Sequence, residues 1–380
     1  MKKTLGWIVE AAPNPLLDRP LLGLTCREHV RRALEDSGVT VIQEEAEFSS
    51  SYDLVLLVRE DAPCLTPELL TSLIQAVSGG SASSASLLSP KRETLALAIP
   101  RDKWFAAVQA QALSNREIAK GLLSSRDGKP APQSQGHKAN TPQACFAVND
   151  AASFSAAYGL LREAIVRRHL QAGVLILEPA RTIIEAGVSI APQVLLYPDN
   201  LLLGNTSIGS GCTLYPGSRL QNAVIGQDST LENSVLLDCT VGSHTTVGPF
   251  AYLRPGTRVG DHCRIGDFVE VKNSAIGDHT KVSHLTYVGD SDLGQHINLG
   301  CGVVFVNYDG KAKNRCTVED HAFIGCNCNL VAPVTIGENA YLAAGSTVVE
   351  DVPADSLYVA RSRGVVKEGW VSKRKEEGKL

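Results

Sequence analysis

The sequence predicts a small α/β domain followed by a parallel β-helix. Three observations predict this. Aliphatic residues recur at every sixth position through the C-terminal half, glycine follows many of them, and the N-terminal region instead alternates apolar runs with helical stretches. A period of six fits neither an α-helix nor an ordinary amphipathic strand. It is typical of hexapeptide repeats, which wind a parallel β-helix.

The six-residue series is the strongest signal in the chain. Its members are Val241, Val247, Leu253, Val259, Ile265 and Val271, then, after a one-residue shift, Ile276, Val282 and Val288, and later Val318, Ile324, Leu330, Ile336, Leu342 and Val348. We expect each of them to point inward and to stack on its equivalent one coil away. Upstream, we expect the repeats to begin loosely near Val188 and Val194 and to become regular after Ile208.

The first 78 residues follow a strand–helix rhythm. Residues 6–9 could form a strand, residues 26–37 have helical spacing, and residues 54–58 are a continuous apolar run that suits a buried parallel strand. Thr66 followed by Pro67 predicts the start of a helix. This order favours a three-layer α/β domain.

The patterns divide the chain into four parts. These are an α/β domain at 1–148, a connecting helix at 149–173, the β-helix at 174–360 and a tail at 361–380. Asn149 or Asp150 can cap the connecting helix. The Ser/Gly-rich stretch 78–89 and the polar stretch 124–142 are expected to be flexible loops or linkers.

Composition excludes several classes of function. With 380 residues the chain is long enough for two cores, and its net charge of −4 gives no reason to expect nucleic acid or an anionic membrane as a partner. No apolar run reaches the length of a membrane span, and we see no secretory signal. The ten cysteines include no CxxC pair, so we interpret them as thiols in a reducing cytoplasm.

Polar residues interrupt the aliphatic pattern in one part of the β-helix. His284 and Tyr287 stand in an otherwise aliphatic coil. Glu270 and Lys272 flank the inward-pointing Val271, so both must point outward along one wall. An insertion between residues 299 and 318 breaks the repeat, and insertions into a solenoid often carry function.

Residues 248–370 closely resemble the acetyltransferase domain of the bifunctional enzymes that make UDP-N-acetylglucosamine. The matching motifs are GPFAYLRPG (248–256), DFVEVKNS (267–274), SHLTYVGD (283–290), HINLGCG (296–302), VNYDGKAK (306–313), FIGCNCNLVAPV (323–334), YLAAGSTV (341–348) and KEGW (367–370). The resemblance implies N-acetylation of glucosamine-1-phosphate by acetyl-CoA, in the synthesis of a cell-wall precursor. It also implies a left-handed β-helix and a homotrimer whose active sites are shared between subunits.

The resemblance implies roles for individual residues. His284 matches the catalytic base that takes a proton from the attacking amine, a role that suits an imidazole. Glu270 could orient this histidine or hold the substrate amine, and Asn307 matches a residue that positions the transition state. The implied sugar-phosphate contacts are Arg254, Lys272, Tyr287, Asn298, Tyr308 and Lys313.

The implied acetyl-CoA contacts lie further along the repeat region. They are Cys301, Cys326, Ala344 and Arg361. Cys326 departs from the pattern, because a serine is common there and a thiol is a weaker hydrogen-bond donor. A nucleophilic Cys326 is conceivable, but we rank it below direct attack by the amine.

The N-terminal region resembles pieces of the same family's uridylyltransferase domain. Asp61 and Asn149 match the positions that hold Mg²⁺ there. The Gly-rich phosphate loop is missing, however, and residues 9–15 (VEAAPNP) stand in its place, while Glu60 adds a negative charge. We therefore predict a shortened, degenerate nucleotidyltransferase-like domain of Rossmann-like type. In this interpretation Asp61 and Asn149 are remnants, and Mg²⁺ is needed only if the domain is active.

Three alternatives stay open. The protein could be bifunctional and also couple its product to UTP, which pyrophosphate release would show. It could acetylate another amino sugar phosphate, or it could be a non-catalytic trimeric scaffold. A scaffold needs only the aliphatic series, so the catalytic motif residues argue against the last alternative.

Overall fold

The computed structural model describes residues 3–11, 13–42, 51–79, 84–88, 94–104, 119–120, 122–123 and 146–379. They fall into two compact units. One comprises residues 1–171 and 183–188, and the other comprises residues 172–182 and 189–380. The predicted linker at 124–142 lies outside the described residues.

The N-terminal unit is built on a five-stranded sheet of order β2-β1-β3-β5-β4. Its strands are β1 (Thr4–Val9), β2 (Thr40–Ile42), β3 (Leu54–Arg59), β4 (Ala85–Leu88) and β5 (Thr94–Pro100). Strand β1 pairs in parallel with β2 and β3, whereas β5 pairs antiparallel with β3 and β4. The presence of β4 corrects the interpretation of 78–89 as a loop: Ala85 and Leu87 alternate inward and are buried, which the serines around them concealed.

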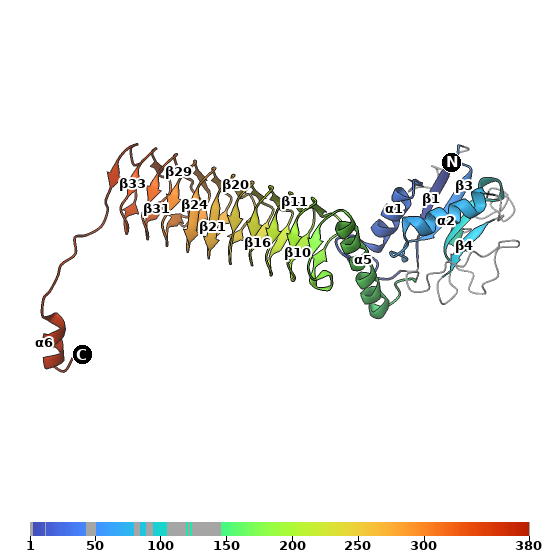
Figure 1. Cartoon of the computed structure of the whole chain (residues 1–380), viewed down its shortest axis with the longest axis horizontal. Coiled ribbons are helices and arrows are strands. Elements are labelled where there is room, and N and C mark those ends of the chain that lie inside the picture. The colour runs from blue at the N-terminus through green and yellow to red at the C-terminus, as the bar shows by residue number, and fades with distance from the viewer. Residues whose placement is uncertain are drawn as a thin grey trace. The chain divides into compact units, whose positions relative to one another are not determined.

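Two capped helices pack against this sheet (Figure 1). Helix α1 (Cys26–Asp36) begins with a capping box between Thr25 and Glu28, and helix α2 (Pro67–Ser78) is capped by Thr66, whose hydroxyl accepts from Leu69 N at 3.4 Å. The side chains of β3 alternate between two cores. One core holds α1 and α2, and the other holds Trp7 and Trp104. The sheet is therefore buried on both faces, as the apolar run at 54–58 indicates.

Helix α5 (Ala151–Gln171) follows. Of the two residues predicted to cap it, Asp150 does so, because its carboxylate accepts from Ser153 N at 2.8 Å. Phe154, Tyr158 and Leu161 pack one face of α5 against the N-terminal unit's third apolar cluster. The boundaries of the four predicted parts stay a prediction.

The second unit is a parallel β-helix of three sheets, which we call faces 1, 2 and 3 in chain order (Figure 1). Face 1 holds β6 (Leu175–Ile176), β9 (Leu195–Leu196), β12 (Thr213–Leu214), β15 (Thr230–Leu231), β18 (Thr246–Val247), β21 (Arg264–Asp267), β24 (Lys281–His284), β27 (Asn298–Leu299), β30 (Phe323–Ile324), β33 (Tyr341–Leu342) and β35 (Leu357–Tyr358). Face 2 holds β10 (Leu201–Leu203), β13 (Arg219–Gln221), β16 (Val235–Leu237), β19 (Tyr252–Leu253), β22 (Glu270–Lys272), β25 (Tyr287–Gly289), β28 (Val304–Val306), β31 (Asn329–Val331) and β34 (Thr347–Val348).

Face 3 completes each coil. It holds β8 (Ser189–Ile190), β11 (Ser207–Ile208), β14 (Val224–Ile225), β17 (Thr240–Val241), β20 (Arg258–Val259), β23 (Ala275–Ile276), β26 (Ser291–Leu293), β29 (Cys316–Val318) and β32 (Thr335–Ile336). The 3-10 turn η2 (Pro179–Arg181) lies between β6 and strand β7 (Ile183–Ile184), and β7 is the first strand of face 2, next to β10. Every predicted member of the six-residue series is buried, which confirms that these residues point inward.

The repeats are regular further upstream than predicted. Buried inward residues recur at a step of six before Ile208 as well as after it, at Ile190, Leu196, Leu202, Ile208, Leu214 and Leu220. Val188 and Val194, predicted to start a loose pattern, are also buried but lie two residues before members of this series. These two buried corner residues, lying beside the series, therefore hid its six-residue period in the sequence.

Stacked side chains line the corners of the coils. Five imidazoles form a ladder with ring centroids 4.6–5.0 Å apart, at His244, His262, His279, His296 and His321. At another corner, Phe250 stacks on Phe268 at 5.5 Å. Because the same corner repeats in each coil, residues about 17 positions apart become lateral neighbours, and this spacing assembles the polar site.

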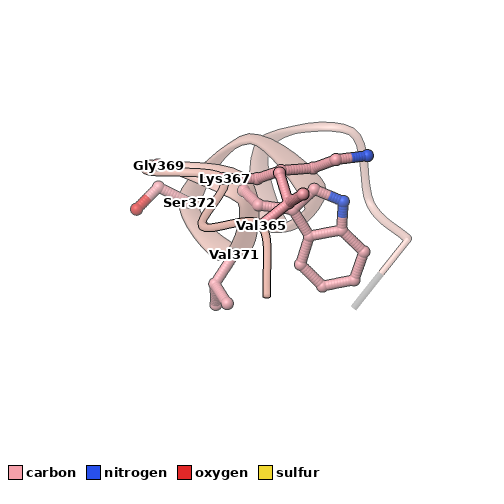
Figure 2. A pocket seen from close by; sticks show the side chains of 6 residues that line it. Val365, Lys367, Gly369, Val371 and Ser372 are labelled. Atoms are coloured by element: carbon pink, nitrogen blue, oxygen red, sulfur yellow. The ribbon is translucent and has the colours of Figure 1, made fainter. Parts of the chain in front are cut away.

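The C-terminal tail carries helix α6 (Trp370–Glu376). Figure 2 shows a hollow beside it that is lined only by tail residues, namely Val365, Lys367, Gly369, Trp370, Val371 and Ser372. It contains none of the residues predicted for chemistry. Among the residues that the structure describes, none of the helices is both long enough and apolar enough to span a membrane.

Candidate active site

His284 lies at the end of β24, where face 1 turns toward face 2. Its neighbour on the preceding coil is Asp267, the last residue of β21, and the two residues are paired in register. The Nδ1 atom of His284 lies 2.6 Å from the Asp267 carboxylate. This hydrogen bond is the largest cause that lowers the pKa of Asp267. About half of the imidazole surface stays exposed, so the ring is held on one side and open on the other.

Glu270 contacts a cation rather than the histidine. Its Oε1 accepts from Arg254 Nη1 at 2.8 Å, and this hydrogen bond raises the pKa of Arg254. Arg254 also lies 5.9 Å from the ring centre of Tyr252. In this structure the carboxylate that contacts the imidazole is Asp267, whereas Glu270 contacts Arg254, and both roles suggested for Glu270 stay predictions.

A buried carboxylate organises the next part of the site. Asp290 accepts from Lys272 Nζ at 3.1 and 3.2 Å, from Asn273 at 2.7 Å and from Asn307 at 2.5 Å. Burial alone would raise the pKa of Asp290, but the hydrogen bonds from Asn273, Lys272 and Asn307 outweigh it and lower the pKa. Asn307, which is itself buried, lies 3.5 Å from the Tyr287 hydroxyl.

The insertion brings a third cation to the same place. Asp309 closes the loop by accepting from the backbone N–H of Lys311 and of Ala312, and from Asn314 Nδ2. The loop places Lys313 beside Lys272. The contact with Lys272 lowers the pKa of Lys313, whereas the hydrogen bond to Lys313 and the Asp290 carboxylate raise the pKa of Lys272.

The charges of this cluster do not cancel. We define the cation cluster as Arg254, Lys272 and Lys313 together with the carboxylates Glu270 and Asp290. With both lysines protonated it carries three positive and two negative charges, so it lacks one anion. The depressed pKa of Lys313 is the expected consequence of two ammonium groups held close together.

The residues predicted to contact acetyl-CoA form one column along a corner. Backbone hydrogen bonds join successive coils there, from Gly302 N to His284 O, from Asn327 N to Cys301 O, and from Gly345 N to Cys326 O. The column therefore runs from His284 past Cys301 and Cys326 to Ala344. The Arg361 side chain lies over Gly345, next to Ala344. The structure thus brings these four predicted residues to one wall that begins at His284.

The remaining two predicted contacts lie at the margins. Asn298 is on β27 of face 1, one coil beyond Lys281, and shares its face with His284. Tyr308 is exposed, and its hydroxyl donates to Gly310 O at 2.8 Å within the insertion. Their roles stay predictions.

Three aspartates of the site, Asp267, Asp290 and Asp309, were not predicted from the sequence. A signal for the first two was present. Asp267 precedes His284 by 17 residues and Asp290 precedes Asn307 by 17, which is the distance to the lateral neighbour one coil away. Asp309 had no such signal, because it acts inside the insertion where the period is lost.

The N-terminal residues fit a metal site poorly. The buried Asp61 carboxylate already accepts two hydrogen bonds from Arg59, at 2.9 and 2.5 Å, and Asn149 is exposed with its backbone N–H on the Ser153 hydroxyl. A hard cation needs several free oxygen ligands. Within the described ranges there is no group of three or more His, Cys, Asp or Glu side chains that could hold a metal.

In the segment that replaces the phosphate loop, the backbone N–H of Ala11 is bonded to a side chain of the protein itself. Glu60 accepts from Ala11 N at 2.7 Å and from Arg27 at 3.0 Å. A carboxylate of the chain itself thus occupies the backbone N–H of Ala11. Together with Arg59 and Asp61, these contacts pair two cations with two carboxylates, so these four side chains carry no net charge.

Known proteins resemble parts of the chain. Residues 238–273 and 315–349 match the family described as bacterial transferase hexapeptide (six repeats). The protein named bifunctional protein GlmU of Clostridium acetobutylicum is 49% identical over 215 residues, which cover 57% of this chain and 47% of that protein. The protein of the same name from Brevibacillus brevis is 46% identical over 244 residues, or 64% of this chain and 53% of that protein.

The chain spans about half the length of the curated relatives it matches. Among solved structures, the UDP-N-acetylglucosamine acyltransferase of Francisella novicida matches with a TM-score of 0.36 and 17% identity, over 54% of this chain and 74% of that one. The Arabidopsis acyltransferase of the same name matches with a TM-score of 0.28 and 17% identity, over 55% of this chain and 76% of that one. The match to the hexapeptide family and the three-sheet coil confirm the predicted fold class, an α/β region followed by a left-handed β-helix.

Proposed function

We propose that this chain, a relative of the bifunctional GlmU proteins over about 60% of its length, is an N-acetyltransferase that uses acetyl-CoA to acetylate glucosamine-1-phosphate. The observation that carries the proposal is the joint presence of a held imidazole and a cation cluster that lacks one anion. They lie on neighbouring coils. His284 ends β24, and the next strand, β25 of face 2, begins three residues later at Tyr287, beside β22, which holds Lys272 of the cluster. A scaffold would require neither feature.

The chemistry requires a base near an amine and a thioester. In the proposed reaction the sugar nitrogen attacks the thioester carbonyl carbon, and Nε2 of His284 accepts the proton that the nitrogen loses. The tetrahedral intermediate then collapses, the C–S bond breaks, and coenzyme A leaves as a thiol after taking up a proton. The amide product keeps the phosphate unchanged.

The cation cluster suits the phosphate of such a substrate. A sugar phosphate would add the missing negative charge and would relieve the repulsion between Lys272 and Lys313. Arg254 can present a planar fork to phosphate oxygens, whereas the lysines act as point charges. Binding is therefore expected to return the pKa of Lys313 toward its ordinary value.

The column from Cys301 to Ala344 is the proposed wall for acetyl-CoA. It begins at His284, so a thioester at its near end would meet the imidazole, and Arg361 lies at its far end as a cation for the nucleotide phosphates. The column offers small residues and backbone groups to an extended chain. We further propose a cytoplasmic homotrimer whose subunits share the active sites, on the resemblance described above.

Release of coenzyme A tests the proposal. Purified full-length protein is mixed with acetyl-CoA and one acceptor, and free thiol is followed with a colorimetric reagent. We expect release with glucosamine-1-phosphate, and little with glucosamine, which lacks the phosphate. Galactosamine-1-phosphate as the better acceptor would favour an acetyltransferase for another amino sugar phosphate. Release with none of these acceptors, together with no acetyl-CoA binding by calorimetry, would favour a scaffold.

A further inference from the structure

We propose that Asp267 is the positioning residue of the catalytic base: its carboxylate holds Nδ1–H of His284, so that the ring presents Nε2 to the substrate amine. This inference rests on the proposed acetyl transfer and adds to it a residue for which the resemblance supplied no role. Three observations carry it. Asp267 contacts the His284 ring directly, the two residues are paired in register on adjacent strands, and Glu270, the other carboxylate suggested for this role, is bonded to Arg254.

The contact is short and built into the sheet. Asp267 and His284 end the adjacent strands β21 and β24, where they are paired in register, and Leu285 N donates to Asp267 O at 3.0 Å just beyond. The 2.6 Å between Nδ1 and the carboxylate is slightly shorter than the roughly 2.7–2.9 Å of charge-assisted N–H···O⁻ hydrogen bonds, so the contact is direct. Because these parallel strands hold their backbones at a fixed spacing, the Asp267 carboxylate is already placed within hydrogen-bond distance of the imidazole.

The partner determines which nitrogen carries the proton. An ionised carboxylate only accepts hydrogen bonds, so the neutral imidazole must carry its proton on Nδ1 and leave the lone pair on Nε2. The hydrogen bond from His284 is the main cause that keeps the pKa of Asp267 low, so the carboxylate stays ionised at neutral pH. When Nε2 accepts the amine's proton, the same carboxylate stabilises the imidazolium.

Among the described residues of this wall, the other two carboxylates that could contact the ring are bonded elsewhere. Glu270 begins the next strand but is bonded to Arg254, and Asp290 is bonded to Lys272, Asn273 and Asn307. The other charged side chains of β21 and β24 are Arg264 and Lys281, both cations. Asp267 is therefore the carboxylate that this wall supplies to the ring.

Two substitutions and one control test the role. Asp267→Ala removes the acceptor, whereas Asp267→Asn keeps an oxygen that can hold Nδ1–H but removes the charge. Asp261→Asn is the matched control, because Asp261 is an exposed aspartate of the same coil whose oxygen accepts from Ser243 N. The readouts are kcat and KM for both substrates, and ¹⁵N NMR of the His284 ring, assigned by comparison with His284→Gln.

We expect Asp267→Ala to lower kcat roughly 10- to 100-fold, by analogy with the loss seen when the partner that orients a metal-binding histidine is removed, with both KM values within about twofold of wild type. Asp267→Asn should recover part of this loss, and Asp261→Asn should match the wild type. The NMR spectrum should show Nδ1–H in the wild type and a mixture of tautomers in Asp267→Ala.

The two readouts separate this inference from the proposed function. A wild type that releases no coenzyme A from any acceptor would refute the acetyl transfer, yet the tautomer measurement would still show whether Asp267 holds Nδ1–H. An active wild type whose ring carries its proton on Nε2, or an Asp267→Ala variant with unchanged kcat, would overturn the positioning role.

Discussion

Two polar sites, one in each unit, differ in how their charges are paired. In the N-terminal unit, Arg27 pairs with Glu60 and Arg59 pairs with Asp61, so these two cations and two carboxylates match one to one. In the β-helix, the cation cluster holds three cations and two carboxylates. The N-terminal pairs leave no charge uncompensated, whereas the cation cluster keeps one positive charge that an anionic ligand would compensate. Residues that look functional in a motif are therefore better judged by whether the chain already supplies their partners.

The largest expected effect falls on the base. His284→Ala should lower kcat by roughly 10²- to 10⁴-fold, because general-base assistance is lost, while KM for the sugar phosphate changes little. His279→Ala is the matched control, since His279 is an exposed histidine of the stacked ladder at another corner. Steady-state kinetics checks both. Equal kcat values for His284→Ala and wild type would remove the imidazole from the mechanism.

The next effect falls on the unmatched cation. Lys313→Met should raise KM for the sugar phosphate roughly 10- to 100-fold, the range for one charge-assisted hydrogen bond, because the cluster loses its excess charge. Lys272 would still neutralise Asp290, so the fold should be undisturbed. Lys311→Met, two residues earlier in the same loop, should bind as wild type does. If both variants lose affinity alike, the loop's overall charge rather than Lys313 attracts the substrate.

A smaller effect is expected from the internal pairing of the N-terminal unit. Asp61→Asn should lower the free energy of unfolding of this unit by about 1–3 kcal/mol, because Arg59 loses its buried ionised partner. Acetyl transfer should be unchanged. Trp7 and Trp104, which pack in this unit's core, report the unfolding by fluorescence during urea titration. Asp18→Asn, an exposed aspartate, is the control. A variant as stable as wild type would show that the Arg59 pair contributes nothing.

The smallest effect is a pH dependence of substrate binding. The contact with Lys272 lowers the pKa of Lys313, so Lys313 loses its charge at a lower pH than an ordinary lysine does. Phosphate binding favours the protonated form, so KM should rise as pH increases through this lowered pKa. In Lys313→Arg the guanidinium stays charged, so the rise in KM at alkaline pH should be a few fold smaller than in the wild type. Parallel alkaline profiles for the two proteins would place the titrating group elsewhere.

Sequence could predict the scaffold well because a β-helix repeats one requirement in every coil. Inward strand positions are aliphatic in nearly every coil, so the series from Val241 to Val348 could be assigned from spacing alone, whereas the inward Phe305 of β28 lay outside it. Most of the cation cluster could be assigned only through motif resemblance, since Arg254 and Lys313 lie 59 residues apart and only the coil brings them together. The partners Asp267 and Asp290 escaped because lateral contacts depend on coil length rather than on local pattern.

The N-terminal unit was harder to predict for a different reason. Its strands and helices followed from apolar runs and caps such as Thr66, but the pairing of Glu60 with Ala11 N and Arg27 depends on tertiary contacts between residues up to 49 positions apart. The sequence indicated only that the phosphate loop was replaced. The structure adds that the Glu60 carboxylate, rather than a bound ligand, accepts the hydrogen bond from the backbone N–H of Ala11 in the replacing segment.

One measurement compares the two units directly. The same preparation of full-length protein is given glucosamine-1-phosphate, acetyl-CoA, UTP and Mg²⁺, and the release of coenzyme A and of pyrophosphate is recorded in parallel. We predict steady release of coenzyme A and no pyrophosphate above the no-enzyme control. Pyrophosphate release at a rate comparable to that of coenzyme A, or no coenzyme A at all, would contradict the account. In that account the polar residues of the N-terminal unit are paired with each other, whereas the cation cluster of the β-helix binds an anionic substrate.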